Sequence, residues 1–168
     1  MNSVAFISGI TGIIANVVIY LQKNGKKMLL WKLISDLLWV THYFSLSAYA
    51  GMAVAMVGVL RETVFLTQNK KGVSHKSLLL FVACACISAA LTWKNIFTLL
   101  PATASVLSVV SFWKASPPLT RFLAYPISLC MLTYDIMCAS YAGVANEILT
   151  LISSTAGIIC YKNRTDKF

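Results

Sequence analysis

Eight ionisable or amide side chains within the apolar segments of this chain are the candidates for chemistry in those segments. They are Asn16, Asp36, His42, Arg61, Glu62, Asp135, Asn146 and Glu147. An ionised side chain at the centre of a bilayer costs about 2.5 to 3.5 kcal/mol on insertion scales, so such residues normally face other helices or water. The set is therefore a candidate pathway for a small polar solute or a proton. The alternative is that it only locks helices together.

The first group of candidates combines acidic and basic side chains. Counting about 1.5 Å per residue from the turn near Tyr49, Asp36 and Arg61 lie at similar depth on successive helices, which predicts an ion pair. Lys32, one helical turn from Asp36, is the alternative partner of that carboxylate. Glu62 adjoins Arg61 but projects about 100° away from it. We therefore expect that Arg61 and Glu62 do not simply neutralise each other.

The second group contains two carboxylates. Asp135 and Glu147 lie at nearly the same distance from a corner at residues 141–143, closer to the outer face of the membrane. Two neighbouring carboxylates in a medium of low dielectric constant tend to share one proton. His42 lies at similar depth in the first half of the chain. These residues predict a proton-linked outer vestibule, and the alternative is shallow side chains hydrated from outside.

The remaining polar and sulfur-containing residues favour structural roles. Asn16 lies near mid-membrane, where a hydrogen bond between helices contributes about 0.6 to 2 kcal/mol; solute contact is the alternative. The five cysteines lie in apolar segments without the spacing of a zinc site or disulfide framework, which indicates buried free thiols. No HExxH or GxSxG motif and no nucleophile–base pair at helical spacing is present. We expect no enzyme activity, metal or cofactor.

The composition indicates that these residues lie in a lipid environment. Of the 168 residues, 58% are hydrophobic and 11% are charged, whereas a soluble domain has about 25% charged residues. A core of this size cannot hide so much apolar surface, so the bilayer is the expected partner. The net charge of +9 is carried by short basic clusters between apolar runs. This pattern reports membrane topology and argues against nucleic-acid binding.

The apolar segments predict seven membrane spans, each close to the 20 residues that a crossing helix needs. We expect them at about 3–21, 28–48, 51–68, 77–93, 96–113, 119–140 and 142–161. The first is expected to remain in place, because the residues before it lack the basic segment of a signal peptide.

Seven spans also sort the basic residues by side, which six spans would not do. One side collects Lys23, Lys26, Lys27, Lys70, Lys71, Lys76, Lys114, Arg121, Lys162, Arg164 and Lys167, and the other has Lys94 alone. Because cytoplasmic loops concentrate Lys and Arg, the N-terminus is expected outside and the C-terminus in the cytoplasm.

The two halves of the chain resemble each other. Segments 37–62 and 129–154 align without gaps, with identities at Leu37/Leu129, Thr41/Thr133, Tyr49/Tyr141, Ala50/Ala142, Gly51/Gly143 and Ala53/Ala145. This pattern predicts a duplicated three-helix unit. The expected fold is an all-α integral membrane protein with seven transmembrane helices. It has two parallel three-helix repeats, 1–76 and 96–168, joined by a linker helix at 77–95. In such proteins solute sites lie near the midplane, between the repeats.

Several short motifs resemble those of the YgjV-type bacterial inner-membrane proteins. They are His42-Tyr43, Tyr49-Ala50-Gly51, Arg61, Leu100-Pro101, Arg121, Tyr134, Gly143 and Glu147. The resemblance covers nearly the whole chain and implies a multi-pass protein of a bacterial inner membrane. It also implies an architecture similar to that of the seven-helix SWEET (PQ-loop) sugar carriers and their half-sized bacterial relatives, without naming a substrate.

One departure from the SWEET pattern concerns the hinge prolines. The resemblance implies a proline in each of the first two helices of both repeats, but only Pro101 and Pro126 are present, and the first repeat has Gly9 and Ile34 instead. This argues against a symmetric rocking motion. The leading hypothesis is a carrier of a small solute, able to form a homo-oligomer. The alternative is a structural or accessory membrane protein that transports nothing.

Overall fold

The computed structural model describes residues 3–68, 73–114 and 116–165, with backbone alone at 161–165. Within these residues it has seven α-helices, one short 3₁₀-helix and no strand, so the all-α prediction is confirmed. The helices are α1 (Ser3–Leu21), α2 (Gly25–Ser45), α3 (Tyr49–Gln68), α4 (His75–Leu91), η1 (Ile96–Thr98), α5 (Leu99–Trp113), α6 (Pro117–Met137) and α7 (Tyr141–Thr165). The predicted loop residues Lys70 and Lys71 and the tail residue Lys167 lie outside the described residues.

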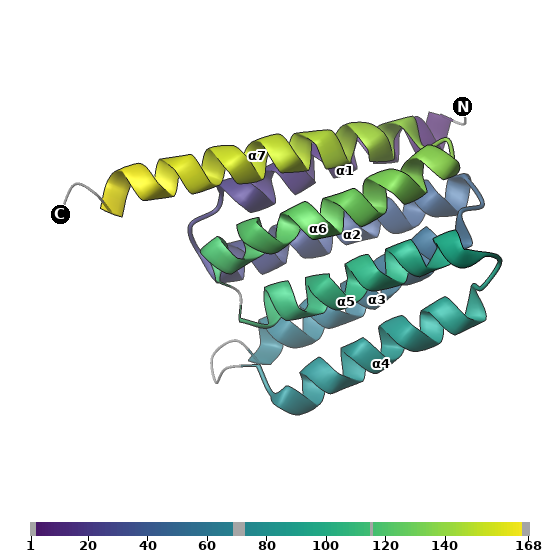
Figure 1. Ribbon diagram of the computed structural model, residues 1–168, viewed down its shortest axis with the longest axis horizontal. Coiled ribbons are helices and arrows are strands. Elements are labelled where there is room, and N and C mark those ends of the chain that lie inside the picture. The colour runs from purple at the N-terminus through teal and green to yellow at the C-terminus, as the bar shows by residue number, and fades with distance from the viewer. Residues whose placement is uncertain (1–2, 69–72, 115, 166–168) are drawn as a thin grey trace.

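The helices form two layers that close into a ring (Figure 1). One layer contains α1, α2 and α3, and the other contains α4 to α7. Helix α1 packs on α2 and α7, and α3 packs on α2 and α5, which closes a ring of α1, α2, α3, α5, α6 and α7. Helix α4 lies outside this ring against α3 and α5. The first and last helices point their free ends toward opposite ends of the bundle.

Two helices begin earlier than the sequence predicts. Helix α2 begins at Gly25, because the side chain of Asn24 accepts hydrogen bonds from the backbone N–H groups of Lys26 and Lys27 and caps it. Helix α6 begins at Pro117. Proline is favoured in the first turn, where its missing N–H group is not needed. The predicted span at 119–140 therefore began too late, because Pro117 and Pro118 belong to the helix and not to the loop before it.

The corners between α2 and α3 and between α6 and α7 also lie earlier than predicted. Tyr49 and Tyr141 already begin the next helices, so the corners occupy 46–48 and 138–140. In each corner, one residue in the left-handed region ends the helix: Ser47 with φ 55° and Ala139 with φ 50°. A Schellman pair of backbone hydrogen bonds closes each turn. The small residues correctly predicted a turn in each corner. The backbone hydrogen bonds decide at which residues that turn lies.

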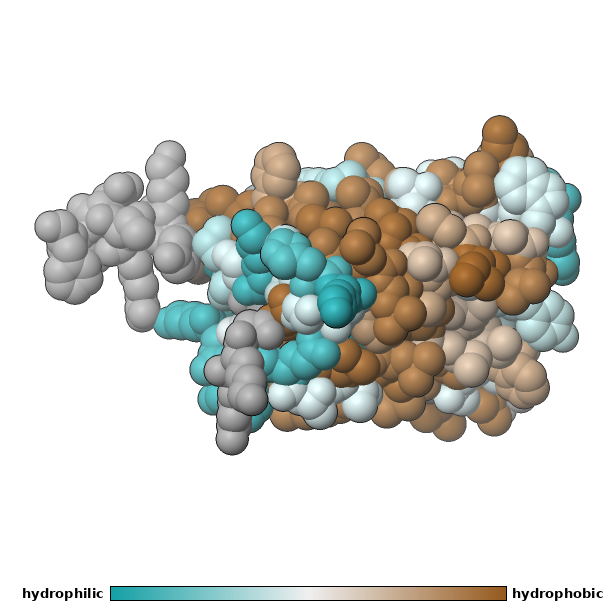
Figure 2. Space-filling view, turned by 90° about the horizontal axis from the view of Figure 1, so that it is seen from below, coloured by the Kyte–Doolittle hydropathy of each residue, from teal (hydrophilic) through white to brown (hydrophobic). Residues whose placement is uncertain are grey.

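The outer surface of the bundle is apolar around its middle. Figure 2, seen from the α4 side, shows apolar side chains over most of the molecule and hydrophilic ones gathered at the end where α4 begins. Four segments are long and apolar enough to cross a membrane: α1, α3, 96–113 and 141–160. Helix α4 is apolar but shorter. Helices α2 and α6 carry charged residues, yet Asp36, Arg121 and Asp135 are buried.

Candidate functional site

A cavity of about 100 Å³ lies inside the ring of six helices. Its lining residues come from α1, α2, α3, α5, α6 and α7, and none of the described residues of α4 takes part. One water molecule occupies about 30 Å³ in the liquid, so the space suits a few waters or a very small solute. Five of the eight predicted residues line it: Asn16, Asp36, Arg61, Asn146 and Glu147.

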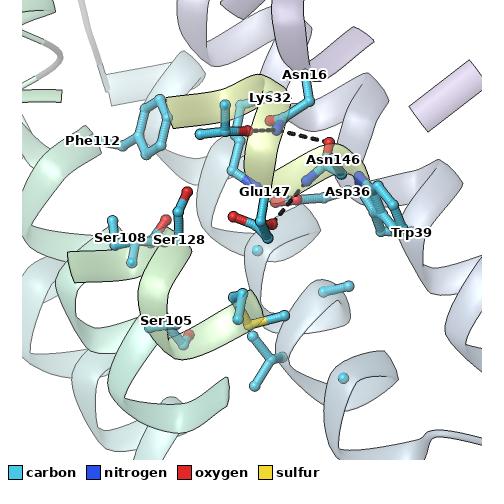
Figure 3. Close-up of a pocket in the computed structure, with 18 of the residues that line it drawn as sticks. Asn16, Lys32, Asp36, Trp39, Ser105, Ser108, Phe112, Ser128, Asn146 and Glu147 are labelled. Atoms are coloured by element: carbon cyan, nitrogen blue, oxygen red, sulfur yellow. Dashed lines mark hydrogen bonds and ion pairs between the residues drawn. The ribbon is translucent and has the colours of Figure 1, made fainter. Parts of the chain in front are cut away.

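A chain of hydrogen bonds joins α1 to α7 across one wall of the cavity (Figure 3). Asn16 Nδ2 donates to Asn146 Oδ1 at 3.0 Å and to Thr150 Oγ1 at 2.7 Å. Asn146 Nδ2 donates in turn to Glu147 Oε1 at 2.8 Å. The predicted helix-bridging role of Asn16 is confirmed. Thr150 was missed, because a threonine in an apolar helix usually bonds only to its own backbone.

Helices α2 and α3 contribute a cluster of charges beside this chain of hydrogen bonds. Lys32 forms an ion pair with Asp36 on the same helix. Arg61 Nη2 lies 4.0 Å from the second oxygen of Asp36, at the limit of an ion pair. Both predicted partners of Asp36 are therefore present, one on each oxygen.

The prediction that Arg61 and Glu62 do not neutralise each other was wrong. Arg61 Nε and Nη2 both donate to Glu62 Oε1, at 3.0 and 2.6 Å. The two Cα–Cβ bonds do diverge, but the long arginine side chain curls back over the helix. Burial favours this arrangement, because Arg61 is 2% exposed and Glu62 is fully buried, and an unpaired charge there would be costly.

Gly58 on α3 makes room for the charge cluster. A Cβ atom at this position would coincide with the carboxylate of Asp36, so a side chain there would force that carboxylate away from Arg61. Sequence reasoning missed Gly58, because a glycine within an apolar helix gives no sign of what it faces. Its position three and four residues before the buried pair Arg61 and Glu62, on the same face of the helix, was the available signal.

His42 connects two helices and a corner at a place outside the cavity lining. One ring nitrogen is 2.8 Å from the carbonyl oxygen of Ala5, and the other is 2.9 Å from Ser140 Oγ. It thereby links α1, α2 and the α6–α7 corner, and it does not line the cavity.

Asp135 also lies outside the cavity lining. Tyr43 donates a hydrogen bond to Asp135 Oδ1 at 2.8 Å, and a Cβ atom at Gly143 would coincide with this carboxyl group. Asp135 is fully buried, so the interpretation of a shallow residue hydrated from outside was wrong. Glu147 lines the cavity and Asp135 does not, but the two carboxyl groups lie close enough to interact electrostatically, and Tyr43, which bonds to Asp135, also lines the cavity.

A second, larger pocket of about 450 Å³ lies at the end of the bundle that holds the α2–α3 and α6–α7 corners. Lys94, Tyr49, Tyr134 and Cys138 contribute to it. The backbone N–H of Gly51 donates to the Tyr134 hydroxyl at 3.1 Å. Because Gly51 lines the central cavity and Tyr134 lines the end pocket, this hydrogen bond belongs to the layer between the two spaces.

The cysteines are free, as predicted, but not all are buried. Cys86 and Cys160 are exposed, and the other three are partly buried. No three His, Cys, Asp or Glu side chains converge in the part of the chain that the structure describes as they would around a metal ion.

Comparison with known proteins agrees with this picture of buried polar groups inside an apolar helical shell. The model of the Imp-YgjV family, described as a bacterial inner membrane protein, matches residues 3–165. No curated protein and no solved structure matches the chain. Because the family match spans nearly the whole sequence, the chain belongs to the Imp-YgjV family of bacterial inner membrane proteins.

Proposed function

We propose that this protein carries a small polar solute across the bacterial inner membrane through the cavity between its two three-helix halves. The observation that carries the proposal is the composition of the cavity wall. Six helices contribute to it and α4 does not. A helix that only joins two repeats is expected to have no place in the solute site. The protein has no catalytic role in this account.

The proposed topology has seven spans, with the N-terminus in the periplasm and the C-terminus in the cytoplasm. Helices α2 and α6 are 21 residues each, and their central charged groups are buried, which leaves apolar side chains toward lipid. Helix α4 has 17 residues and would extend about 26 Å, close to the hydrocarbon thickness of about 30 Å. The described basic loop residues other than Lys94 belong to the end where α2, α4 and α6 begin, which supports a cytoplasmic location for that end.

The cavity lining supports the proposed duplication. Adding 92 to a residue number converts the first half into the second, as in Leu37 and Leu129. Seven pairs of lining residues obey this offset: Asn16/Ser108, Tyr20/Phe112, Asp36/Ser128, Trp39/Met131, Val54/Asn146, Ala55/Glu147 and Gly58/Thr150. Ser47 and Ala139, the two left-handed corner residues, obey it as well. A pseudo-twofold axis through the cavity, along the membrane normal, accounts for all of these pairs.

The alternative is a structural or accessory protein without a solute pathway. The observation that favours it is that polar residues of the cavity lining already bond to one another. Asn16 bonds to Thr150, and Asp36 pairs with both Lys32 and Arg61. A cavity of about 100 Å³ is also below the roughly 300 Å³ at which ordinary ligand pockets begin. A carrier must therefore widen this space in another state of its cycle.

Ligand-dependent thermal stabilisation of the purified protein, screened over sugars, amino acids and organic anions, tests the proposal. A carrier should be stabilised by one class, because a ligand that binds only the folded state raises its stability. The variant Ser105→Phe, which fills the cavity, should lose that stabilisation, whereas Leu79→Phe on the exposed face of α4 should keep it. Stabilisation that survives Ser105→Phe, or none from any class, would favour the accessory role.

A further inference from the structure

We infer that the solute of this cavity is a small organic cation with a protonated amine, and that it exchanges for a proton held by Glu147. The inference rests on the proposed carrier function and deepens it. It follows from the distribution of charge around the cavity, from the groups that face Glu147 and from the aromatic side chains beside it.

The charges on α2 and α3 compensate one another. Lys32 pairs with Asp36, and Arg61 contacts both Asp36 and Glu62. This cluster contains two cations and two anions and is neutral as a unit. It therefore offers no uncompensated positive charge to an anionic solute.

Glu147 is the carboxylate of the cavity wall that the cluster leaves without a counter-charge. Among the described residues, no Lys, Arg or His nitrogen lies within 4.0 Å of its oxygens. Its polar partners are the Asn146 amide, which donates to Oε1, and the Ser128 hydroxyl group. A carboxylate held in a low-dielectric cavity requires a bound cation or a proton. In the empty protein that requirement is met by a proton.

The rest of the cavity lining suits an ammonium group. Ser105 and Ser108 on α5 and Ser128 on α6 line the cavity as well (Figure 3), with Ser128 beside the Glu147 carboxyl group, and each hydroxyl can accept a hydrogen bond from N–H. Trp39 also lines the cavity, and an aromatic face attracts organic ammonium ions. A space of about 100 Å³ admits such a head group with one or two carbon atoms.

The exchange balances in charge and atoms. When R–NH₃⁺ binds, the O–H bond of the Glu147 carboxyl group breaks, its electron pair remains on the oxygen, and the proton passes to water. The carboxyl group and its occupant together have zero net charge before and after. Cation and proton then compete for one carboxylate, so the apparent affinity for the cation should rise with pH, by at most about tenfold per pH unit.

Other titratable or charged groups lie around Glu147 on four helices and can affect its response to pH. They are Tyr20 on α1, Lys32, Asp36 and Tyr43 on α2, Arg61 and Glu62 on α3, and Asp135 on α6. Four of them form the neutral cluster, and Asp135 bonds to Tyr43, which lines the cavity. Because Asp135 and Glu147 interact electrostatically, the control is placed elsewhere, at Leu79 on the exposed face of α4.

The experiment adds methylammonium chloride to the purified full-length protein in weak buffer and records proton release with a pH indicator. N-methylglucamine acetate supplies an anion whose counter-cation is too large for the cavity, glycerol supplies a neutral solute, and sodium chloride supplies an alkali cation. We expect close to one proton released per methylammonium bound, and none with the other three. Glu147→Gln, which keeps the bond from Asn146, should abolish release and weaken binding by about 30-fold or more. Leu79→Phe on the exposed face of α4 should leave both unchanged.

Several results would overturn the inference. Binding of acetate or glycerol without methylammonium would refute the cation preference while leaving the carrier proposal intact. Sodium acting in place of methylammonium would refute the amine, and undiminished binding by Glu147→Gln would refute the role of Glu147. Should Glu147→Gln fail to fold, the wild-type series from pH 6 to 9 still decides, since an affinity independent of pH excludes exchange. If no probe binds at all, the inference fails, and the Ser105→Phe comparison judges the carrier separately.

Discussion

At the residue level, a missing side chain is as important as the charged ones. Gly58 allows the carboxylate of Asp36 to lie against α3, where Arg61 reaches it. The same arrangement recurs at Gly143, which makes room for Asp135. In both halves, a glycine on one helix lets a buried carboxyl group of the preceding helix approach its backbone. Adding a side chain at Gly58 or Gly143 should therefore destabilise the protein, because a carboxyl group already occupies the space.

Gly58→Ala should lower the free energy of unfolding by about 1 to 3 kcal/mol, because the new methyl group displaces the Asp36 carboxylate and strains the ion pairs. Denaturant titration of the purified protein in detergent measures the change. The control is Gly12→Ala, where the nearest atoms belong to the Trp39 ring, at 3.2 Å from the new Cβ. There the gain in helix propensity of about 1 kcal/mol offsets the tight contact. Equal losses in the two variants would contradict this explanation.

Asn16→Ala should destabilise the protein by about 0.6 to 2 kcal/mol, because it removes the hydrogen bonds from α1 to Asn146 and Thr150. Thr11→Ala is the matched control, since the Thr11 hydroxyl bonds only to the backbone of its own helix. Its effect should stay below about 0.5 kcal/mol. If both variants behave like wild type in the same titration, the Asn16 bonds do not hold α1 to α7.

Some of this site could be predicted from sequence. The Asp36–Arg61 pair depends on depth alone, and depth follows from counting residues along two successive helices. The bond from Tyr43 to Asp135 could not be predicted, because it depends on which helices of the two halves meet side by side. The Arg61–Glu62 pair was missed for another reason: backbone geometry sets where a side chain starts but not where a long one ends.

At the level of helices, α2 and α3 are held together by charge as well as by packing. Both helices contribute apolar residues to the core, and Asp36 and Arg61 connect them at mid-length. A hydropathy measure places α3 among possible spans but not α2, which carries Lys32 and Asp36. Pairing with its neighbour allows α2 to remain in an apolar environment despite those charges.

A double-mutant cycle with Asp36→Asn and Arg61→Gln should return a coupling energy of about 0.5 to 3 kcal/mol between α2 and α3. In each single variant the remaining residue keeps its other ion pair, Asp36 with Lys32 or Arg61 with Glu62. Both single variants lose the same Asp36–Arg61 contact, so the double variant should be more stable than the sum of the two losses predicts. Unfolding free energies of the four proteins supply the cycle. Strict additivity would mean that the 4.0 Å approach contributes nothing.

The exact ends of the helices could not be predicted from the sequence. The number and order of the helices followed from apolar run lengths. The early start of α2 depends on the cap at Asn24 and that of α6 on Pro117. Both residues are visible in the sequence, but polar and proline residues are equally common in loops, and only the backbone hydrogen bonds distinguish the two uses.

At the level of the whole molecule, the odd number of helices sets the proposed orientation. With seven crossings, the chain ends lie on opposite sides, and the described helix ends are arranged accordingly (Figure 1). Reporter fusions test this directly. An alkaline phosphatase fusion at the N-terminus should be active in the periplasm, and a fluorescent protein at the C-terminus should be fluorescent in the cytoplasm. Both ends in one compartment would rule out the seven-span arrangement.

The proposed carrier function depends most on a central cavity that water and solute can reach from either side. Its direct test replaces the five native cysteines with alanine, introduces Ser108→Cys on the cavity wall and adds a small, water-soluble thiosulfonate to one side of oriented vesicles at a time. Leu79→Cys on the exposed face of α4 serves as the control that only lipid contacts. The account predicts modification of the Ser108 variant from both sides and none of the Leu79 variant. A folded Ser108 variant that reacts from neither side would contradict it.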